Sequence, residues 1–315
     1  MKKSDKKFSV NIYAIIVGVV LLAYSLSIIT PLLWGLMTSL KHRVDFGTPG
    51  TILSFPNMEI WELYSGNLFT NYSTLVNDIK IEVSKTFFAG LDLNTQVTNY
   101  DKVDLFKFIL NTLMYAGGTA FFAALAPCIM GYLCAKFKYK FSGVIYTFVL
   151  FVMVMPIVGN TTAVITLMRR FSIYDTIWGM WLKGATFANT YFLIFFAFFS
   201  GVSDTYAEAA YLDGASYGKV MWTIYMPLAI KTITTVFLLQ FVALYNDYNT
   251  SLVYIPTHPT LAYAVWYFSR GMDGGAENTP RNFAAAMTLA LPMVLLFAIF
   301  KKKLMGDISV GGIKE

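Results

Sequence analysis

One polar stretch interrupts an otherwise apolar chain and holds residue types that are able to do chemistry. Residues 206 to 227 read YAEAAYLDGASYGKVMWTIYMP, with Glu208, Asp213 and Lys219 set among alanines and glycines. A glycine followed by a lysine is part of the phosphate-binding pattern G-x-x-x-x-G-K-[ST]. Gly218-Lys219 lacks both the earlier glycine and the following Ser or Thr. We therefore expect no nucleotide-binding site in this chain.

The sequence also offers little to a metal ion. His42 and His258 lie far apart in polar stretches, and Cys128 and Cys134 lie in or beside one apolar run. This spacing is that of neither a zinc site nor a disulfide framework. We interpret the two cysteines as small buried hydrophobes, and we expect no catalytic residue, no metal and no cofactor in this chain.

The polar stretch predicts a short helix that ends in a tight turn. Thr205-x-x-Glu208 has the spacing of a capping box, in which the Thr hydroxyl and the Glu carboxylate satisfy backbone N–H groups at the helix start. We expect a helix from Tyr206 to Leu212, and we expect Gly214 to end it in a left-handed conformation.

A second helix is expected to start near Ala215 and to feed into the next apolar span. Pro227 should kink that entry, because proline removes a backbone hydrogen bond and clashes with the preceding turn. Three alanines keep the first helix thin, so that the backbone of another protein can approach it closely: Ala207, Ala209 and Ala210. On local physics alone, a surface loop with a helix cap and a glycine stop is the favoured interpretation of the stretch.

The elements that must position this stretch are membrane helices. The chain has 315 residues, of which 57% are hydrophobic and 13% charged, and its mean hydropathy is +0.57, whereas soluble domains are about 25% charged. A helix that crosses the hydrocarbon needs about 20 mostly apolar residues. We predict an all-α integral membrane protein with about six transmembrane helices, near residues 13–37, 108–133, 143–167, 178–199, 224–245 and 283–300.

Lysines at the ends of these spans predict the orientation. Short basic ends mark the cytoplasmic side, and three clusters fall on one side of six alternating spans: Lys2, Lys3, Lys6 and Lys7; Lys136, Lys138 and Lys140; and Lys301, Lys302 and Lys303. Both termini and the stretch 206–227 are then cytoplasmic, and residues 41–104 and 246–281 are extracellular. Arg169 and Arg170 fall outside, against the rule. The net charge is +6, and the basic residues are clustered at the ends of the spans. They therefore do not form the basic stripe of a nucleic-acid-binding surface.

With this placement, the polar stretch resembles the EAA signature of permease subunits in binding-protein-dependent ABC importers. The spacing EAA-x3-G-x9-I-x-L-P is matched, with methionine in place of the usual leucine, by Glu208-Ala209-Ala210, Gly214, Ile224, Met226 and Pro227. Three further segments resemble the MalG-like carbohydrate branch of this family: Asn111-Thr112-Leu113, Tyr245-Asn246-Asp247-Tyr248 and Gly311-Gly312-Ile313-Lys314. The resemblance is strong over residues 105 to 315, and the long segment 41–104 departs from the shortest members.

The resemblance implies a type I ABC importer (MetI-like) permease fold and a division of the chain. Residues 1–40 would be the N-terminus and first span, 41–104 an extracellular insertion, 105–304 the core, and 305–315 a cytoplasmic tail. A coupling helix within 203–222 would dock on an ATPase subunit through Glu208, Ala209, Ala210, Asp213, Gly214 and Ala215. The tail would contact the ATPase dimer through Gly311, Gly312 and Lys314.

The same resemblance implies the partners. These are a second permease subunit, two ATPase subunits that bind ATP and Mg, an extracellular solute-binding lipoprotein and membrane lipid, with no nucleic acid. The expected function is the import of a carbohydrate, an oligosaccharide in our interpretation, across the bacterial plasma membrane. ATP hydrolysis would belong to the separate ATPase subunit.

Residues near the outer side leave alternatives open. Asn246 and Asp247 either line the translocation path or hold the outer loop through Asx-type bonds. Tyr263, Trp266 and Tyr267 either face the binding protein and its sugar or form an interfacial aromatic belt. An ion-coupled secondary transporter would need ionisable groups near mid-membrane, for which the sequence offers poor candidates. An ABC permease for a non-sugar solute and a membrane scaffold are the remaining alternatives.

Overall fold

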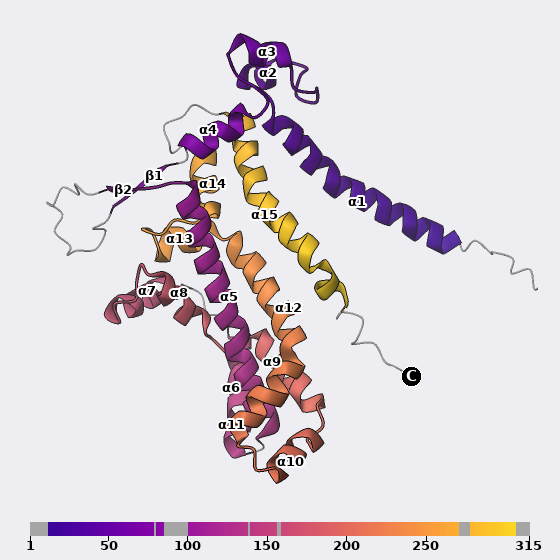
Figure 1. Ribbon diagram of the computed structural model, residues 1–315, viewed down its shortest axis with the longest axis vertical. Coiled ribbons are helices and arrows are strands. Elements are labelled where there is room, and N and C mark those ends of the chain that lie inside the picture. Colours follow the sequence, from indigo (N-terminus) through magenta and orange to yellow (C-terminus); the bar gives the residue numbers. More distant parts are fainter. Residues whose placement is uncertain are drawn as a thin grey trace, which may run out of the picture. The chain divides into compact units, whose positions relative to one another are not determined.

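The structure is a computed structural model of the chain (Figure 1). It describes residues 12–78, 80–84, 100–137, 139–155, 159–270 and 278–306. The chain divides into two compact units. The first combines Met1–Asp78 with Gly271–Ala290, and the second combines Ile79–Arg270 with Leu291–Glu315.

The first unit is built on two apolar helices that pack side by side. Trp34 on the first helix meets Phe283 on the last one edge to face, with ring centroids 5.1 Å apart. Gly35 permits this approach, because a Cβ atom there would lie 2.9 Å from the methyl carbon of Met287. The helices of this unit are α1 (Ile12–Ser39), α2 (Arg43–Gly47), α3 (Met58–Leu63), α4 (Thr70–Asp78) and the first part of α15 (Thr279–Gly306).

Polar contacts fasten the short helices that follow α1. The Lys41 ammonium is fully buried and donates to the carbonyl oxygens of Thr51 and Ile52. The Asn71 amide donates to the carbonyl oxygens of Ser39 and Lys41, at 2.8 Å each. Because these bonds run to backbone carbonyls, no pattern of residue types in the sequence reveals them.

The second unit is organised around one long helix. Figure 1 shows α5 running along most of this unit, and α8, α9 and α12 pack against it. The helices of the unit are α5 (Leu105–Lys136), α6 (Lys140–Val154), α7 (Thr161–Arg170), α8 (Ile177–Gly184), α9 (Thr190–Gly201), α10 (Thr205–Leu212), α11 (Tyr217–Val220), a π-helical turn (Met221–Tyr225), α12 (Met226–Tyr245), α13 (Tyr248–Tyr254) and α14 (Leu261–Ser269).

Small residues on α5 let the neighbouring helices approach closely. A Cβ atom on Gly118 would lie 2.1 Å from the indole nitrogen of Trp181, and that nitrogen donates to the carbonyl oxygen of Met114 at 2.8 Å. A Cβ atom on Gly131 would lie 2.9 Å from the backbone nitrogen of Phe196 on α9. Close backbone approach through glycine is a common way for membrane helices to pack.

Both cysteines lie in this helical core, which confirms their interpretation as buried hydrophobes. The Cys128 sulfur lies 3.8 Å from the sulfur of Met226, at the contact between α5 and α12. Cys134 packs in a second cluster with Val149 of α6 and Phe192 of α9.

Four helices among the described residues are long and apolar enough to cross a membrane: Ile15–Ser39, Leu105–Lys136, Tyr217–Tyr245 and Thr279–Ile299. They correspond to the first, second, fifth and sixth predicted spans. The apolar helices α6 and α9, with 15 and 12 residues, correspond to the third and fourth.

The predicted continuous spans 143–167 and 178–199 are wrong, because each is broken. α6 ends at Val154, and Met155 is extended with ψ of 119°, as expected of a residue that precedes a proline. The second break separates α8 from α9, and Asn189 accepts the N–H groups at the start of α9. A side chain that caps a helix start competes with helix continuation.

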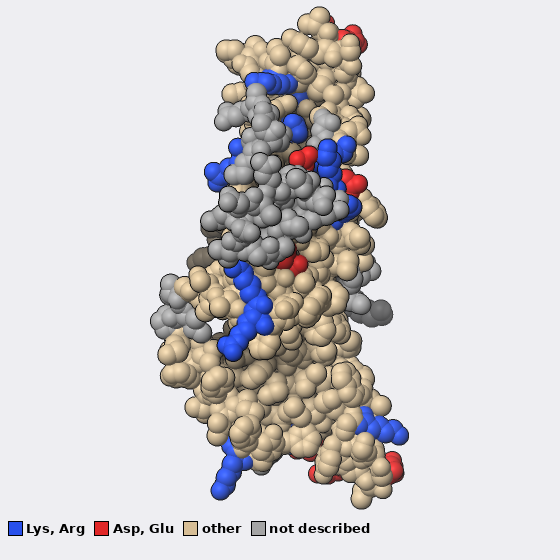
Figure 2. Space-filling view, turned by 90° about the vertical axis from the view of Figure 1, so that its left-hand side faces the viewer, with Lys and Arg blue, Asp and Glu red and all other residues tan. Residues whose placement is uncertain are grey.

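A two-stranded antiparallel ribbon precedes α5. It joins β1 (Ile81–Ser84) to β2 (Tyr100–Val103), with Ile81 opposite Val103. Residues 41–104 are thus divided between the two units. Figure 2 shows that uncharged residues form most of one face of the molecule, as the small share of charged residues in the sequence requires.

Candidate functional site

The turn after α10 is closed as the sequence predicts. Gly214 has a φ of +80°, in the left-handed region. Its N–H donates to the carbonyl oxygen of Tyr211 at 3.0 Å, and the N–H of Ala215 donates to that of Ala210 at 2.9 Å. This pair of bonds is a Schellman turn. The prediction that Gly214 ends the helix in a left-handed conformation is confirmed.

The predicted capping box is wrong. Asp204 takes the cap position in a helical conformation, with φ of −75° and ψ of −14°, and its side chain makes no cap bond. The Thr205 hydroxyl pairs with that of Ser203 at 2.8 Å, and Glu208 is exposed. The Asp204 carboxylate instead lies 2.6 Å from the Lys136 ammonium. This ion pair fixes Asp204, so the helix starts one residue early and Thr205 falls within its first turn.

α10 exposes most of its surface. Among its described residues Ala207 is buried, whereas Glu208 and Ala209 are exposed and Ala210 is half-buried. Leu212 at its end is 89% exposed. Asp213 and Gly214 are exposed in the turn, and Ala215 is half-buried. The residues predicted to couple therefore lie together on one short helix and its turn, accessible to a partner. No observation tests their coupling role, which stays a prediction.

The second helix begins two residues after its predicted start and runs into α12. Ser216 caps it by accepting the N–H of Lys219 at 3.4 Å. A π-helical turn follows, in which the N–H of Met226 donates to the carbonyl oxygen of Met221. α12 begins at Met226 directly after this turn, and Pro227 is its second residue. A π turn, a known source of helix irregularity, therefore lies at the entry where the kink was expected, and the kink itself stays a prediction.

A pocket of about 230 Å³ lies behind α10, at the end of α5. Burial raises the pKa of the Tyr211 hydroxyl, and Tyr217 and Asp204 add to the rise. The Tyr132 hydroxyl is buried and has no hydrogen-bond partner among the described residues. The pocket is aromatic and polar, lined by Tyr132, Lys136, Phe137, Asp204, Ala207, Glu208, Tyr211, Tyr217 and Tyr225.

Asn246 and Asp247 lie where α12 ends and α13 begins. The Asn246 amide donates to the carbonyl oxygen of Val242 at 3.0 Å. The Asp247 carboxylate accepts the N–H groups of Asn249 at 2.9 Å and Thr250 at 3.1 Å, so it caps α13. These are the Asx-type bonds of the second alternative. A role in the translocation path stays a prediction.

The segment after Leu252 contains the nine-residue helix α14 (Leu261–Ser269). Trp266 on this helix stacks on Tyr248 of α13, with ring centroids 5.2 Å apart and planes 7° apart. Tyr263 lies 5.7 Å from Trp266 and 6.1 Å from Tyr267, between ring centroids. The three predicted aromatic residues are half-buried and form one cluster.

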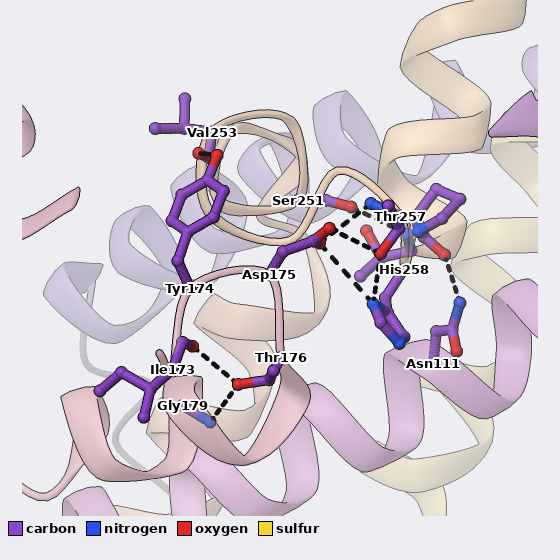
Figure 3. A network of polar contacts seen from close by, with 12 residues as sticks. Asn111, Ile173, Tyr174, Asp175, Thr176, Gly179, Ser251, Val253, Thr257 and His258 are labelled. Carbon is purple, nitrogen blue, oxygen red and sulfur yellow. Dashed lines mark hydrogen bonds and ion pairs between the residues drawn. The ribbon is translucent and has the colours of Figure 1, made fainter. Parts of the chain in front are cut away.

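A network of polar contacts holds the turn between α13 and α14 to the turn before α8 (Figure 3). The Asp175 carboxylate accepts the Thr257 N–H at 3.1 Å and the Thr257 hydroxyl at 2.8 Å, and it lies 3.7 Å from the His258 ring nitrogen. The Asp175 N–H donates to the carbonyl oxygen of Tyr254 at 3.1 Å. The φ of Asp175 is +58°, a conformation that Asp tolerates better than most residues.

The same turn is fastened to α5. The Asn111 amide donates to the carbonyl oxygen of Pro259 at 3.1 Å. The Thr112 hydroxyl accepts the N–H of Leu261 at 2.8 Å. Segments more than a hundred residues apart in sequence are thus joined at this end of the unit (Figure 3).

The tail residues Gly311, Gly312 and Lys314 lie outside the described residues, as do the lysines of the N-terminus. Their predicted roles therefore remain predictions.

Residues 128–302 match the family described as "Binding-protein-dependent transport system inner membrane component". The chain belongs to this family. The matched segment covers more than half of the permease and includes α10, its glycine turn and α14. The EAA signature therefore led to the right family.

Relatives and a solved structure extend this match over nearly the whole permease. It is 22% identical to the diacetylchitobiose uptake system permease protein NgcG of Streptomyces coelicolor, over 98% of this chain and 90% of that protein. It is also 22% identical to the maltose/maltodextrin transport system permease protein MalG of Vibrio vulnificus, over 94% of each chain.

The fold matches the crystal structure of a bacterial ABC transporter involved in the import of the acidic polysaccharide alginate. The TM-score is 0.67 and the sequence identity 18%, over 96% of this chain and 98% of that one. The predicted type I ABC importer permease fold is confirmed.

Sequence reasoning missed two features of the permease. Lys136 was counted as an orientation signal, and its ion pair with Asp204 was not foreseen; its position at the last residue of an apolar span was the available signal. The clamp of Asp175 on Thr257 was also missed, because its partners lie 82 residues apart.

Proposed function

We propose that this permease is a membrane subunit of an ATP-driven importer that moves a carbohydrate across the plasma membrane. The carbohydrate, an oligosaccharide in our proposal, arrives on an extracellular solute-binding protein. The observation that carries the proposal is the turn formed by α10, Gly214 and α11. It is exposed and closed by two backbone bonds, and its alanines allow another backbone to approach. Such a shape suits docking on an ATPase subunit.

The proposed orientation places this turn and both termini in the cytoplasm. The lysine clusters of the sequence support it. The N-terminal, Lys136–Lys140 and Lys301–Lys303 clusters all fall on the side of α10 when the spans alternate. The segment from Leu252 to Arg281 then faces outward.

The proposed assembly contains four kinds of subunit besides lipid. This permease pairs with a second permease, and two ATPase subunits bind ATP and Mg on the cytoplasmic side. A solute-binding lipoprotein delivers the sugar outside. The sequence lacks the phosphate-binding pattern, so we assign hydrolysis to the ATPase subunits and no cofactor to this chain.

The carbohydrate class rests on the relatives. NgcG, MalG and the melibiose/raffinose/stachyose import permease MelC of Bacillus subtilis all carry sugar names. The last is 22% identical over 72% of this chain and 83% of that protein. Aromatic rings stack on sugar faces, and the cluster on α14 supports a place for sugar release at the outer side.

The test is reconstitution of the complete complex in lipid nanodiscs with its binding protein. Oligosaccharides are screened one by one for stimulation of ATP hydrolysis, with amino acids and oligopeptides as the comparison set. We expect stimulation by one or a few oligosaccharides. Stimulation by a non-sugar solute alone would assign another cargo, and uptake that needs an ion gradient but no ATP would refute the ATP-driven importer.

Contact with the binding protein is tested on α14. A photo-crosslinker replaces Tyr263 or Trp266, and sugar-loaded binding protein is added to a complex arrested in the outward-open state. We expect crosslinks to the binding protein. Crosslinks confined to the second permease would show that α14 contacts that subunit instead.

Contact between the tail and the ATPase is tested by deletion. A variant that lacks residues 309–315 is expected to retain less ATPase on purification or to import less sugar. Full retention and full import would show that the tail is a dispensable end.

A further inference from the structure

The last residue of α5 places a buried charge at the start of α10. The Lys136 side chain is 9% exposed. Its ammonium donates to the carbonyl oxygen of Val202 and to the Asp204 carboxylate at 2.6 Å. It also lies 5.2 Å from the ring centroid of Tyr225, over the ring of the π turn. One amine therefore touches three segments: the end of α9, the start of α10 and the entry to α12.

The chemistry of an ammonium makes this arrangement specific. Lysine has three donors and no acceptor, and here two donors go to a carbonyl and a carboxylate while the aromatic face covers the cation. Removing Lys136 takes this partner away from the Asp204 carboxylate. Asp204 is the more exposed partner, at 57%, so water can solvate it when Lys136 is absent.

α10 is otherwise held by apolar contacts in the described structure. Ala207 belongs to the core cluster that also contains Tyr132 and Tyr225, and Ala210 and Tyr211 pack against that cluster. The pocket of about 230 Å³ lies beside these contacts. Lys136 adds a charged contact between the start of this exposed helix and the long helix α5.

We propose that Lys136 is a positioning residue that couples α10 to α5. When the ATPase displaces α10, the displacement then passes through α5 to α8, α9 and α12. This inference rests on the proposed function. α5 packs against α8, α9 and α12, so a force applied at its end is distributed across the unit. Without the link, α10 moves with the ATPase while α5 stays behind.

The test compares Lys136→Met with Lys140→Met in the reconstituted complex. Methionine keeps the apolar stem and removes the donors. Lys140 is an exposed lysine at the same end of the unit, which matches the change in charge. ATP hydrolysis and sugar uptake are measured together, with the amount of ATPase retained. Coupling between distant sites is typically worth about 5- to 150-fold, so we expect Lys136→Met to raise the ATP hydrolysed per sugar imported about tenfold.

A second variant keeps the test valid if Lys136→Met does not assemble. Asp204→Asn keeps an acceptor oxygen for the ammonium and removes the negative charge. We expect the ATP hydrolysed per sugar imported to rise in this variant too, but by less than in Lys136→Met. The double variant is expected to be no worse than Lys136→Met alone, because both changes break one link.

Three outcomes would overturn the inference. The first is an unchanged ratio in Lys136→Met. The second is a rise of the same size in Lys140→Met. The third is additive effects of the two single variants. A wild-type complex that no sugar-loaded binding protein stimulates would refute the proposed function instead, so the two failures are distinguishable.

Discussion

The two ends of the second unit are built in opposite ways. At one end, α10 exposes most of its surface and is held by a few apolar contacts and by the Lys136 ammonium. At the other, the turn between α13 and α14 is pinned to two distant segments through Asp175 and Asn111. A lightly held helix can follow a docked partner, whereas a pinned turn keeps its shape while neighbouring helices move. We expect the α10 end to move with a docked partner and the pinned end to keep its shape.

The largest loss of sugar uptake is expected when Gly214, at the lightly held end, is replaced. Gly214→Val forces a β-branched residue into a left-handed conformation, which costs an L-residue about 1–2 kcal/mol or more. Nothing lies within 4 Å of the added Cβ atom, so the strain is in the backbone alone. We expect the protein to insert in the membrane and sugar uptake to be lost.

Gly218→Val is the matched control for this prediction. Gly218 also has open space around it, but it lies in a helix without a positive φ. Uptake by this control should remain close to the wild-type rate. Normal uptake by Gly214→Val, or equal loss in both variants, would refute the importance of the turn.

The pinned end should respond in stability rather than in coupling. Asp175→Ala removes the acceptors of the Thr257 N–H and hydroxyl. Thr257 is half-buried, so we expect a cost near the lower end of the about 1–3 kcal/mol for a buried unpaired group. We expect a lower midpoint of thermal unfolding of the purified permease. Asp175→Asn retains an acceptor and tolerates the left-handed φ, so it should lose less; an equal loss in both would assign the effect to charge.

Asp247→Ala should have a smaller effect and decides between two roles. Loss of a helix cap costs about 1 kcal/mol, and Asn replaces Asp well at this position. If Asp247 is a cap, import of all sugars falls together with the protein level, and Asp247→Asn restores both. If it lines the path, import of one sugar changes more than import of another.

The smallest effects come from two equivalent caps at opposite ends. Ser216 caps α11 at an exposed site, and Thr260, which is 1% exposed, caps α14 by accepting the N–H of Tyr263 at 3.3 Å. Replacing a cap by alanine costs about 0.5–2 kcal/mol. We expect Thr260→Ala to lie at the upper part of that range and Ser216→Ala at the lower part. Thermal unfolding that ranks them in reverse would contradict the contrast between the ends.

Features that depend on local sequence were predictable. Gly214 predicted the turn after α10, because a left-handed helix end favours glycine. The apolar runs predicted the four long membrane helices, because length and composition are enough to identify them. The family followed from the spacing between Glu208, Gly214 and Pro227.

Features that depend on distant contacts were not predictable. The cap at Thr205 failed because Lys136, 68 residues earlier, holds Asp204. The spans near Met155 and Asn189 failed because an average over an apolar run hides one extended residue or one capping side chain. The clamp at Asp175 needs the tertiary fold to bring Thr257 to it.

Because both cysteines are buried, the rate at which their thiols react reports how often the helical core opens. Cys128 lies at the contact of α5 with α12, and Cys134 lies between α5, α6 and α9. A maleimide reagent reacts with a buried thiol only after local opening exposes it. The labelling rate of Cys128 therefore measures how often α5 and α12 separate, and that of Cys134 measures how often the contact of α5 with α6 and α9 opens. Since Cys128 and Cys134 are already present in the sequence, this labelling measurement needs no engineered cysteine.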